Sequence, residues 1–258
     1  MDLQANCGLP LKFDDINENF SYGEEIVFDS IERVPLRTML PGLLNKSLRY
    51  PETVYTQHRN IRRKQDEDMF HNTNLNYDIV MLPSGLMGVE FIRSHIYHKK
   101  KTEEGGFQLS EIIEVLAGKL TILLQRNEPK GEDWDMNTKV SEGLVVKLEG
   151  GEKFAVPRGY FYTFINTRTK PVVFSRFYMD DCHCDYNEFQ QEQGLAYFAI
   201  RKNAKQEFVL NPRYREIPEV RQIQSCKEIS GMDEVSNNIR EDEPLYVQLM
   251  NNPGLAML

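Results

Sequence analysis

Two histidines and one glutamate in the middle of the chain are of residue types that commonly bind metal ions. His95 and His98 end one apolar stretch, and Glu111 begins the next. Imidazole and carboxylate groups suit divalent transition metals such as iron, manganese, nickel or zinc, and such a set leaves positions open to water or substrate. Residues three apart in a strand point to opposite faces unless the strand ends or bulges. We therefore predict a metal on His98 and Glu111, with His95 or Tyr162 as a further ligand. The alternative is that only His98 faces the cavity and that no site forms.

An aromatic segment lies further along the chain, within Pro157–Asn166. If Tyr160, Tyr162 and Phe164 share one face, they line either the core or a pocket. Tyr162 is the candidate proton donor, and the alternative is that its ring fills the barrel. A second group, Cys182-His-Cys184, resembles half of a zinc knuckle, but the other half is missing, so no separate zinc site is expected.

The elements that must position these residues are short β-strands. Runs of β-branched and aromatic residues alternate with Gly, Pro and Asn turns, which predicts an all-β meander closing into a barrel or jelly roll. The predicted strands and their turns cover residues 77–82, 88–98, 111–125, 143–157, 158–166, 172–178, 195–200 and 207–210.

The two ends of the chain carry weaker signals. Residues 1 to about 35 receive no firm prediction beyond a short strand at Ile26–Phe28, and residues 226–242 are polar enough to predict poor order. Pro244–Met250 has helical spacing of its apolar residues and a Pro in the first turn, which predicts a short docking helix.

Composition excludes several classes of protein. The 258 residues are 40% hydrophobic, enough for one core with appendages, and the net charge of -8 argues against nucleic-acid binding. The N-terminus lacks a basic start followed by an apolar segment, and no apolar run approaches the roughly 20 residues of a membrane span. The four cysteines do not form a disulfide framework in a chain this long. We therefore expect a cytoplasmic protein that binds a small molecule and neither nucleic acid nor membrane.

Several blocks from about Pro51 onward resemble the cupin-type glucose-6-phosphate isomerases of archaea and some bacteria. The matching blocks are Tyr77–Ser94, which resembles the opening strand pair, Glu111–Gln125, Val156–Asn166, the spacing from Tyr178 to Tyr186, Leu195–Ile200, Asn211–Tyr214 and Pro244–Tyr246. The resemblance implies an all-β cupin, a double-stranded β-helix or jelly-roll barrel with N- and C-terminal arms and a short C-terminal helix. It places the arm at residues 1–50, the barrel at 51–215 and the C-terminal extension at 216–258, and it implies a homodimer.

The resemblance also implies roles for single residues. Glu111 and His98 match two metal ligands of the family, His95 lies one place before a third, and Tyr162 replaces the last. The implied catalytic residues are Glu111 and Tyr162. The implied substrate contacts are Ser94, Tyr160, Tyr178 and Tyr186, whereas Val80 and Ile113 replace a Thr and a Tyr of the family.

The function implied is a divergent, metal-assisted sugar-phosphate isomerase, which interconverts aldose and ketose by proton transfer. Two alternatives remain. One is a metal-dependent cupin of another reaction class, such as a non-haem iron oxygenase, since two His and one carboxylate are the ligands of such enzymes. The other is a binding cupin without catalysis.

Overall fold

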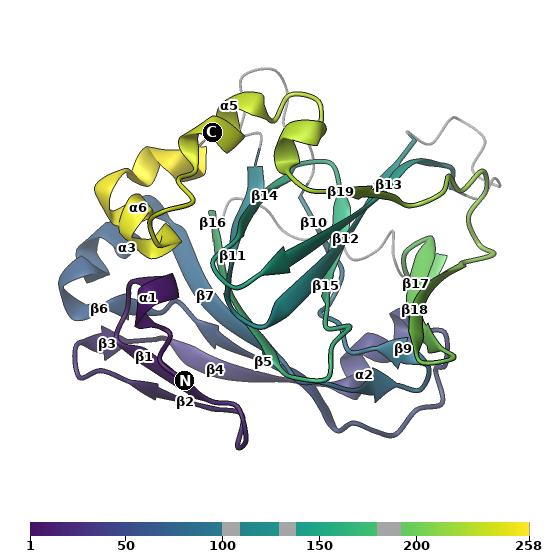
Figure 1. Ribbon diagram of the computed structural model, residues 1–258, viewed down its shortest axis with the longest axis horizontal. Helices are drawn as coiled ribbons and strands as arrows, with labels where there is room; N and C mark the ends of the chain where they lie inside the picture. The colour runs from purple at the N-terminus through teal and green to yellow at the C-terminus, as the bar shows by residue number, and fades with distance from the viewer. Residues whose placement is uncertain (100–108, 129–137, 180–191, 258) are drawn as a thin grey trace.

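Two mainly antiparallel sheets face each other across the main hydrophobic core. The computed structural model describes residues 1–99, 109–128, 138–179 and 192–257 (Figure 1). One sheet has the strand order β14 (Lys153–Pro157), β11 (Leu109–Ala117), β16 (Val172–Met179), β7 (Leu75–Leu82), β5 (Thr53–Arg59), β4 (Ser30–Pro35). The other has the order β10 (Tyr97–His98), β15 (Phe161–Ile165), β12 (Lys119–Asn127), β13 (Val140–Glu149), β19 (Arg221–Ile223). Their inner faces meet at Phe164 and Phe174, whose ring centroids are 4.8 Å apart.

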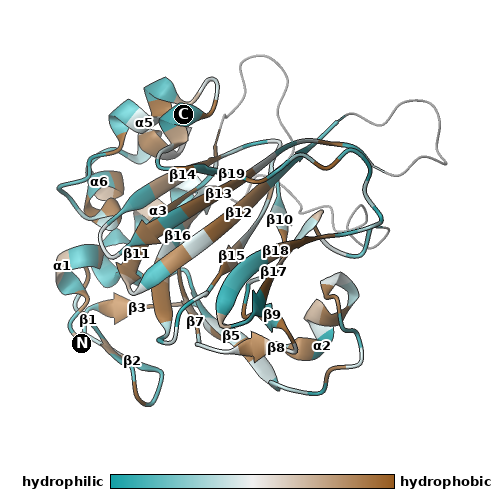
Figure 2. Cartoon of the chain, turned by 45° about the vertical axis from the view of Figure 1, so that its right-hand side comes forward, coloured by the Kyte–Doolittle hydropathy of each residue, from teal (hydrophilic) through white to brown (hydrophobic). Residues whose placement is uncertain are grey.

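A third sheet covers the outer face of β15 and β12. Its strands are β18 (Lys205–Leu210), β17 (Tyr197–Lys202), β9 (Glu90–Phe91) and β8 (Leu86–Met87). A second apolar cluster, which includes Leu123, Phe161 and Tyr197, fills the space between the layers. In Figure 2 β15 is mostly hydrophobic, and β18 changes from hydrophilic in its first half to hydrophobic in its second.

The remaining elements are short and lie around the main barrel (Figure 1). β1 (Leu11–Asp14) and β2 (Asn19–Tyr22) form a short hairpin, and β3 (Ile26–Val27) pairs with the distant β6 (Arg62–Arg63) in a second two-stranded sheet. In the described ranges the helices are α1 (Gln4–Cys7), α2 (Leu36–Met39), α3 (Glu67–Thr73), α5 (Asp233–Asn238) and α6 (Leu245–Asn251), with short 3-10 turns at Leu40–Gly42, Lys64–Asp66, Cys226–Glu228 and Pro253–Met257. Within the described ranges no helix is long and apolar enough to cross a membrane.

The predicted barrel strands and the docking helix are confirmed, most closely by β7 and α6. The single strand predicted over residues 88–98 is wrong. Gly88 has a φ of +68°, β9 pairs with β17, and β10 pairs with β15, so this segment passes from one sheet to another. The residues between the two strands bond to the end of β15 instead, since Ser94 N donates to the carbonyl oxygen of Phe164.

Residues 226–242 are ordered, contrary to the prediction. The turn Cys226–Glu228 begins with a capping box, in which the Ser225 hydroxyl accepts from the Lys227 N–H and Glu228 bonds back. Ile229, Met232 and Val235 are buried against the core. Five buried residues, spaced three or four apart, dock this otherwise polar segment on the core: Cys226, Ile229, Met232, Val235 and Ile239.

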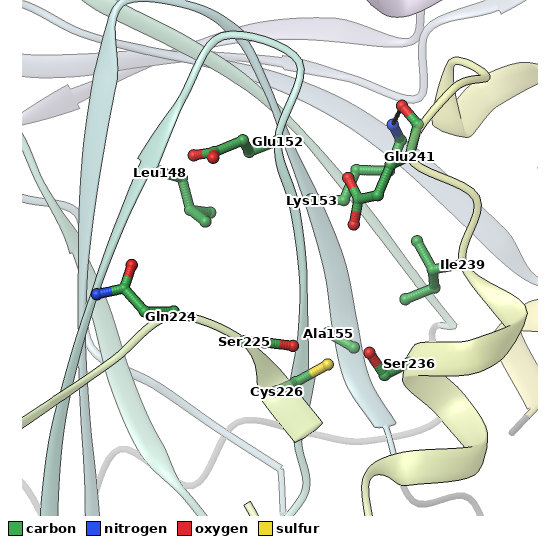
Figure 3. A pocket seen from close by; sticks show the side chains of 10 residues that line it. All are labelled: Leu148, Glu152, Lys153, Ala155, Gln224, Ser225, Cys226, Ser236, Ile239 and Glu241. Carbon is green, nitrogen blue, oxygen red and sulfur yellow. Dashed lines mark hydrogen bonds between the residues drawn. The ribbon is translucent and has the colours of Figure 1, made fainter. Parts of the chain in front are cut away.

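A buried ion pair attaches this C-terminal region to the barrel. Lys153 Nζ lies 3.0 Å from Glu114 Oε1, and Glu114 Oε2 accepts from the Leu245 N–H at 2.9 Å, at the start of α6. Lys153 also donates to the carbonyl oxygen of Glu241 at 3.3 Å, beside a small pocket of about 120 Å³ (Figure 3). Burial, opposed by Lys153 and the Leu245 N–H, raises the pKa of Glu114 to about 7.

This raised pKa predicts a pH-dependent contribution to stability. Because the native Glu114 holds its proton to higher pH than the unfolded chain, with an ordinary pKa near 4.3, its contribution falls as pH rises from about 4.3 to about 7. Urea unfolding gives the free energy of unfolding of wild type and of Glu114→Gln. The difference between these two free energies should change by up to about 3 kcal/mol over this pH range. In Glu114→Gln, Lys153 also loses its carboxylate partner, which adds the same amount to the difference in unfolding free energy at every pH. If the difference in unfolding free energy between the two proteins is the same at pH 4.5 and pH 8, the pKa of Glu114 is not raised by folding.

Candidate active site

Arg176 and Glu111 form a buried ion pair in the interior of the barrel. Arg176 Nε lies 2.6 Å from Glu111 Oε2, and Arg176 Nη2 lies 3.2 Å from Glu111 Oε1. The Glu111 side chain is 1% exposed and that of Arg176 is 6% exposed. Both oxygens of the carboxylate are therefore occupied by one guanidinium in a bidentate pair, the geometry that suits arginine best.

Strand register places these charges on the inner face of the sheet. Ile113 of β11 stands opposite Arg176 of β16, which stands opposite Asp78 of β7. Because side chains alternate along a strand, Glu111 lies on the same face as Ile113. Two residues before Arg176 on β16, the cross-strand neighbours on the same face are apolar, with Phe174 opposite Val80. A charged layer thus lies on an apolar floor.

Aromatic rings surround the guanidinium of Arg176. Its Cζ atom is 4.0 Å from the ring centroid of Tyr97, 5.2 Å from that of Tyr178 and 5.6 Å from that of Phe164. Tyr162 packs against Tyr97 with ring centroids 5.7 Å apart. These desolvated cation–π contacts add to the ion pair, and together they offset part of the cost of burying both charges.

A chain of polar groups leads from this centre toward the surface. Tyr97 Oη lies 3.3 Å from Tyr55 Oη, which lies 2.9 Å from His95 Nδ1. Burial, reinforced by the nearby Arg93, lowers the pKa of His95 to about 4, and a hydrogen bond with the Thr38 backbone opposes this shift. The imidazole is therefore neutral at physiological pH and is held on two sides.

A second polar cluster lies at the end of β16, beside Tyr178. The Tyr178 hydroxyl donates to Asp78 Oδ2 at 2.8 Å, and Arg59 Nη1 donates to the same oxygen at 3.1 Å and to the Tyr178 hydroxyl at 3.2 Å. Lys99 Nζ is 5.3 Å from the ring centroid of Tyr178. Arg59, Lys99 and Arg176 therefore gather three positive charges around one half-buried tyrosine.

The sequence profile of the family described as "Glucose-6-phosphate isomerase (GPI)" matches residues 44–215, more than half of the chain and including every residue of this centre. The chain belongs to the cupin-type glucose-6-phosphate isomerase family. The two facing sheets are accordingly the expected cupin barrel.

Solved structures show weaker likenesses to this family member. Oxalate decarboxylase from Bacillus subtilis matches 54% of the chain and 29% of its own at 11% identity, with a TM-score of 0.33. The vicilin from Solanum melongena matches 51% of the chain and 30% of its own at 11% identity, with a TM-score of 0.32. Peruvianin-I, a cysteine peptidase from Thevetia peruviana latex, matches 40% of the chain and 49% of its own at 13% identity, with a TM-score of 0.27. The chain therefore spans at most about half of these proteins. No curated protein sequence matches it.

The metal-binding set implied by the family resemblance is not assembled in this chain. Among the residues that the structure describes, no three His, Cys, Asp or Glu side chains form a group able to hold a metal. Glu111 gives both oxygens to Arg176, and His95 is held by Tyr55 and Thr38. His98 stacks on Phe161 with ring centroids 3.8 Å apart. A guanidinium already provides the positive charge beside Glu111 in this structure, and the metal site on His95, His98 and Glu111 stays a prediction.

The remaining predicted residues have different surroundings. Tyr162 lies in the aromatic group beside Arg176, and Tyr178 lies in the polar cluster at the end of β16. Ser94 is fully buried and bonds to its surroundings through its hydroxyl, which donates to the His95 carbonyl oxygen at 2.7 Å and accepts from the Phe164 N–H at 3.1 Å. Ser94 is therefore bound into the barrel framework in this structure, and its contact with a substrate stays a prediction.

Tyr160 and Tyr186 do not lie in either of these groups among the described residues. Tyr160 lies over Arg126, 5.3 Å from Cζ to the ring centroid, and its hydroxyl donates to Glu142, so it contacts β12 and β13 instead of the Arg176 group. Tyr186, with Cys182 and Cys184, lies outside the described residues.

Sequence reasoning missed the residues that dominate this centre: Arg176, Tyr97, Tyr55, Asp78 and Arg59. One signal was present. Arg176 is a lone charge in the apolar run Val172–Tyr178, and an inward-pointing charge in a buried strand requires a partner. The partner itself is 65 residues away in sequence and is fixed only by strand pairing.

Removal of one member of the ion pair should be strongly destabilising. Arg176→Met leaves Glu111 buried without compensation, which typically costs about 3–5 kcal/mol. Adding Glu111→Gln to that variant should recover much of the loss, and Arg240→Met, in an exposed pair with Asp242, should leave stability nearly unchanged. Urea unfolding of these four proteins and of the single variant Glu111→Gln measures these differences. Additive losses from the two core substitutions would contradict the paired geometry.

Divalent metals should leave the stability of the wild-type protein unchanged. A site filled at 100 times its Kd would add about 2.7 kcal/mol, which raises Tm by roughly 5–10 °C in a chain of this size. Thermal unfolding with manganese, iron, nickel or zinc should therefore show no such shift. A saturable rise in Tm that disappears in Glu111→Gln would restore the family's metal site.

Proposed function

We propose that the chain interconverts the aldose and ketose forms of a sugar phosphate by proton transfer. Membership in the glucose-6-phosphate isomerase family supports this class of reaction. The observation that carries the proposal is the buried Glu111–Arg176 pair beside the phenols of Tyr97 and Tyr162, because it joins a carboxylate base, a fixed cation and proton donors.

The proton balance of the reaction fits these groups. Glu111 takes the proton from the carbon beside the carbonyl, and the C–H electrons form the carbon–carbon double bond of an enediol. The carbonyl electrons move onto oxygen, where a phenol donates a proton, and the reverse steps on the neighbouring carbon complete the isomerisation. Arg176 stabilises the negative charge that develops. Burial raises the pKa of Tyr97, which keeps that phenol protonated and able to donate.

The divalent metal implied by the resemblance, iron, manganese, nickel or zinc, assists this chemistry where it is bound. In this chain it would have to displace Arg176 from Glu111. The proposal therefore assigns each step to the chain's own residues. The same displacement argues against an iron oxygenase, which needs the two His and the carboxylate together.

The phosphate group is assigned to the polar cluster at the end of β16. Arg59 and Lys99 supply positive charge beside Tyr178, whose hydroxyl is half-buried and close to both. The floor below is apolar, because Val80 and Ile113 are fully buried on the inner face. The homodimer implied by the family resemblance is part of this proposal and is tested by sedimentation.

Removing the proposed base should abolish turnover. A panel of aldose and ketose phosphates with five to seven carbons identifies the substrate, and Glu111→Gln should then lower kcat by at least about 100-fold, the usual contribution of general base catalysis. Circular dichroism at low temperature confirms that the variant is folded. Tyr160→Phe is the matched control and should keep wild-type kinetics, since Tyr160 lies against Glu142. Full activity in Glu111→Gln would exclude this base, and binding of the panel without turnover would favour a binding cupin.

Glucose 6-phosphate should be a poor substrate. Val80 and Ile113 place apolar groups where the family has a Thr and a Tyr, and each lost hydrogen bond to a charged phosphate costs about 1.5–3 kcal/mol. We therefore expect kcat/KM for glucose 6-phosphate below about 10⁴ M⁻¹s⁻¹, the lower end of the ordinary enzyme range. Steady-state kinetics give this constant directly, and a higher value would show that Arg59 and Lys99 fully replace the lost contacts.

Tyr178→Phe should raise KM more than it lowers kcat. This change removes the hydroxyl beside Arg59 but leaves the ring against Lys99 and Arg176. Loss of one charge-assisted hydrogen bond predicts an increase in KM of roughly 10-fold to 100-fold. An unchanged KM with lowered kcat would instead place Tyr178 at the reacting carbons.

A further inference from the structure

A cleft of about 410 Å³ lies at the end of the barrel opposite the Tyr178 cluster. Its wall includes Ser84, which follows β7, and the turn Thr167–Thr169, which precedes β16. Tyr178 stands near the other end of β16. At about 3.3 Å per residue, the two places are roughly 20 Å apart along the strand. The cleft is therefore separate from the proposed active site.

The charged residues that line this cleft are all positive. Lys147 comes from β13, Arg168 from the β15–β16 turn and Arg201 from β17. Within the described part of the chain their side chains form no ion pair or hydrogen bond. Nearby acids are already paired, since Glu149 contacts Lys119 and Glu207 contacts Lys202. Three unpaired cations around one cleft are a local excess in a protein of net charge -8.

The hydroxyl-bearing wall of the cleft is held rigidly by a buried asparagine. Asn166 is fully buried, and its Nδ2 donates to the carbonyl oxygens of Leu82, Pro83 and Lys170 at 2.9–3.1 Å. Its Oδ1 accepts from the Arg168 N–H at 2.9 Å. Ser84 and the turn that carries Arg168 are thus fixed relative to each other before any ligand arrives, which lowers the entropic cost of binding.

We propose that this cleft is a second binding site, for a small phosphate-bearing anion. Arg168 and Arg201 provide planar guanidinium groups suited to phosphate oxygens, and Lys147 adds a point charge. Ser84, Thr167 and Thr169 add hydroxyl donors. The volume lies in the range of small-molecule pockets, so the ligand is a phosphorylated metabolite or diphosphate rather than a macromolecule. Nothing in this site depends on the reaction in the barrel.

Titration with inorganic pyrophosphate tests this proposal. Isothermal titration at 150 mM salt compares wild type with Arg168→Gln/Arg201→Gln. Both arginines are exposed, so the variant should fold normally. We expect at least 10-fold weaker binding in this variant. Arg213→Gln/Arg215→Gln removes two exposed arginines elsewhere and should bind as wild type does.

Lys99→Gln separates this site from the one in the barrel. It removes a cation beside Tyr178 and should leave the affinity for pyrophosphate at the cleft unchanged. Equal losses in the cleft variant and the Arg213/Arg215 control would show that only general charge attracts the anion and would overturn the proposal. A loss confined to Lys99→Gln, or no binding by wild type at 1 mM pyrophosphate, would also overturn it.

Discussion

The burial of two opposite charges in the barrel interior determines much of the structure around them. Removing a carboxylate and a guanidinium from water costs several kcal/mol for each ion, and only close, complete pairing compensates for this. Arg176 meets this need by bonding both oxygens of Glu111 while its flat face lies against Tyr97. The aromatic surroundings are a consequence, because a desolvated guanidinium gains most from ring faces.

The same pair explains why family membership and local chemistry diverge. In this chain the carboxylate of Glu111, which the resemblance implies as a metal ligand, is paired with an internal cation, and Tyr162 stands where the resemblance implies a histidine. The phenols of Tyr97, Tyr55 and the neutral His95 then form a hydrogen-bonded chain beside this cation. A site that uses hydrogen bonds and a fixed guanidinium can stabilise an enediolate, and its electrostatics are preorganised by the strands that carry it.

Sequence periodicity was sufficient for the barrel but not for the centre inside it. β7 and α6 could be predicted because their apolar residues follow the periods of a strand and a helix. The segment around His95 and His98 could not, because its backbone leaves one sheet and joins another, so alternation along a single strand no longer sets the direction of each side chain. The Glu111–Arg176 contact depends on the pairing of β11 with β16, which local sequence does not specify. The C-terminal segment was missed for a related reason, since its buried residues dock on a surface formed by distant strands.

The central claim is that Glu111, paired with Arg176, moves a proton beside a carbonyl without a metal ligand set. The most direct measurement is the incorporation of solvent deuterium into a sugar phosphate in D₂O, followed by proton NMR. The account predicts deuterium at the carbon beside the carbonyl at a rate that a chelator does not change, and loss of this exchange in Glu111→Gln. Exchange that persists in Glu111→Gln, or that a chelator abolishes in the wild-type protein, would contradict the account.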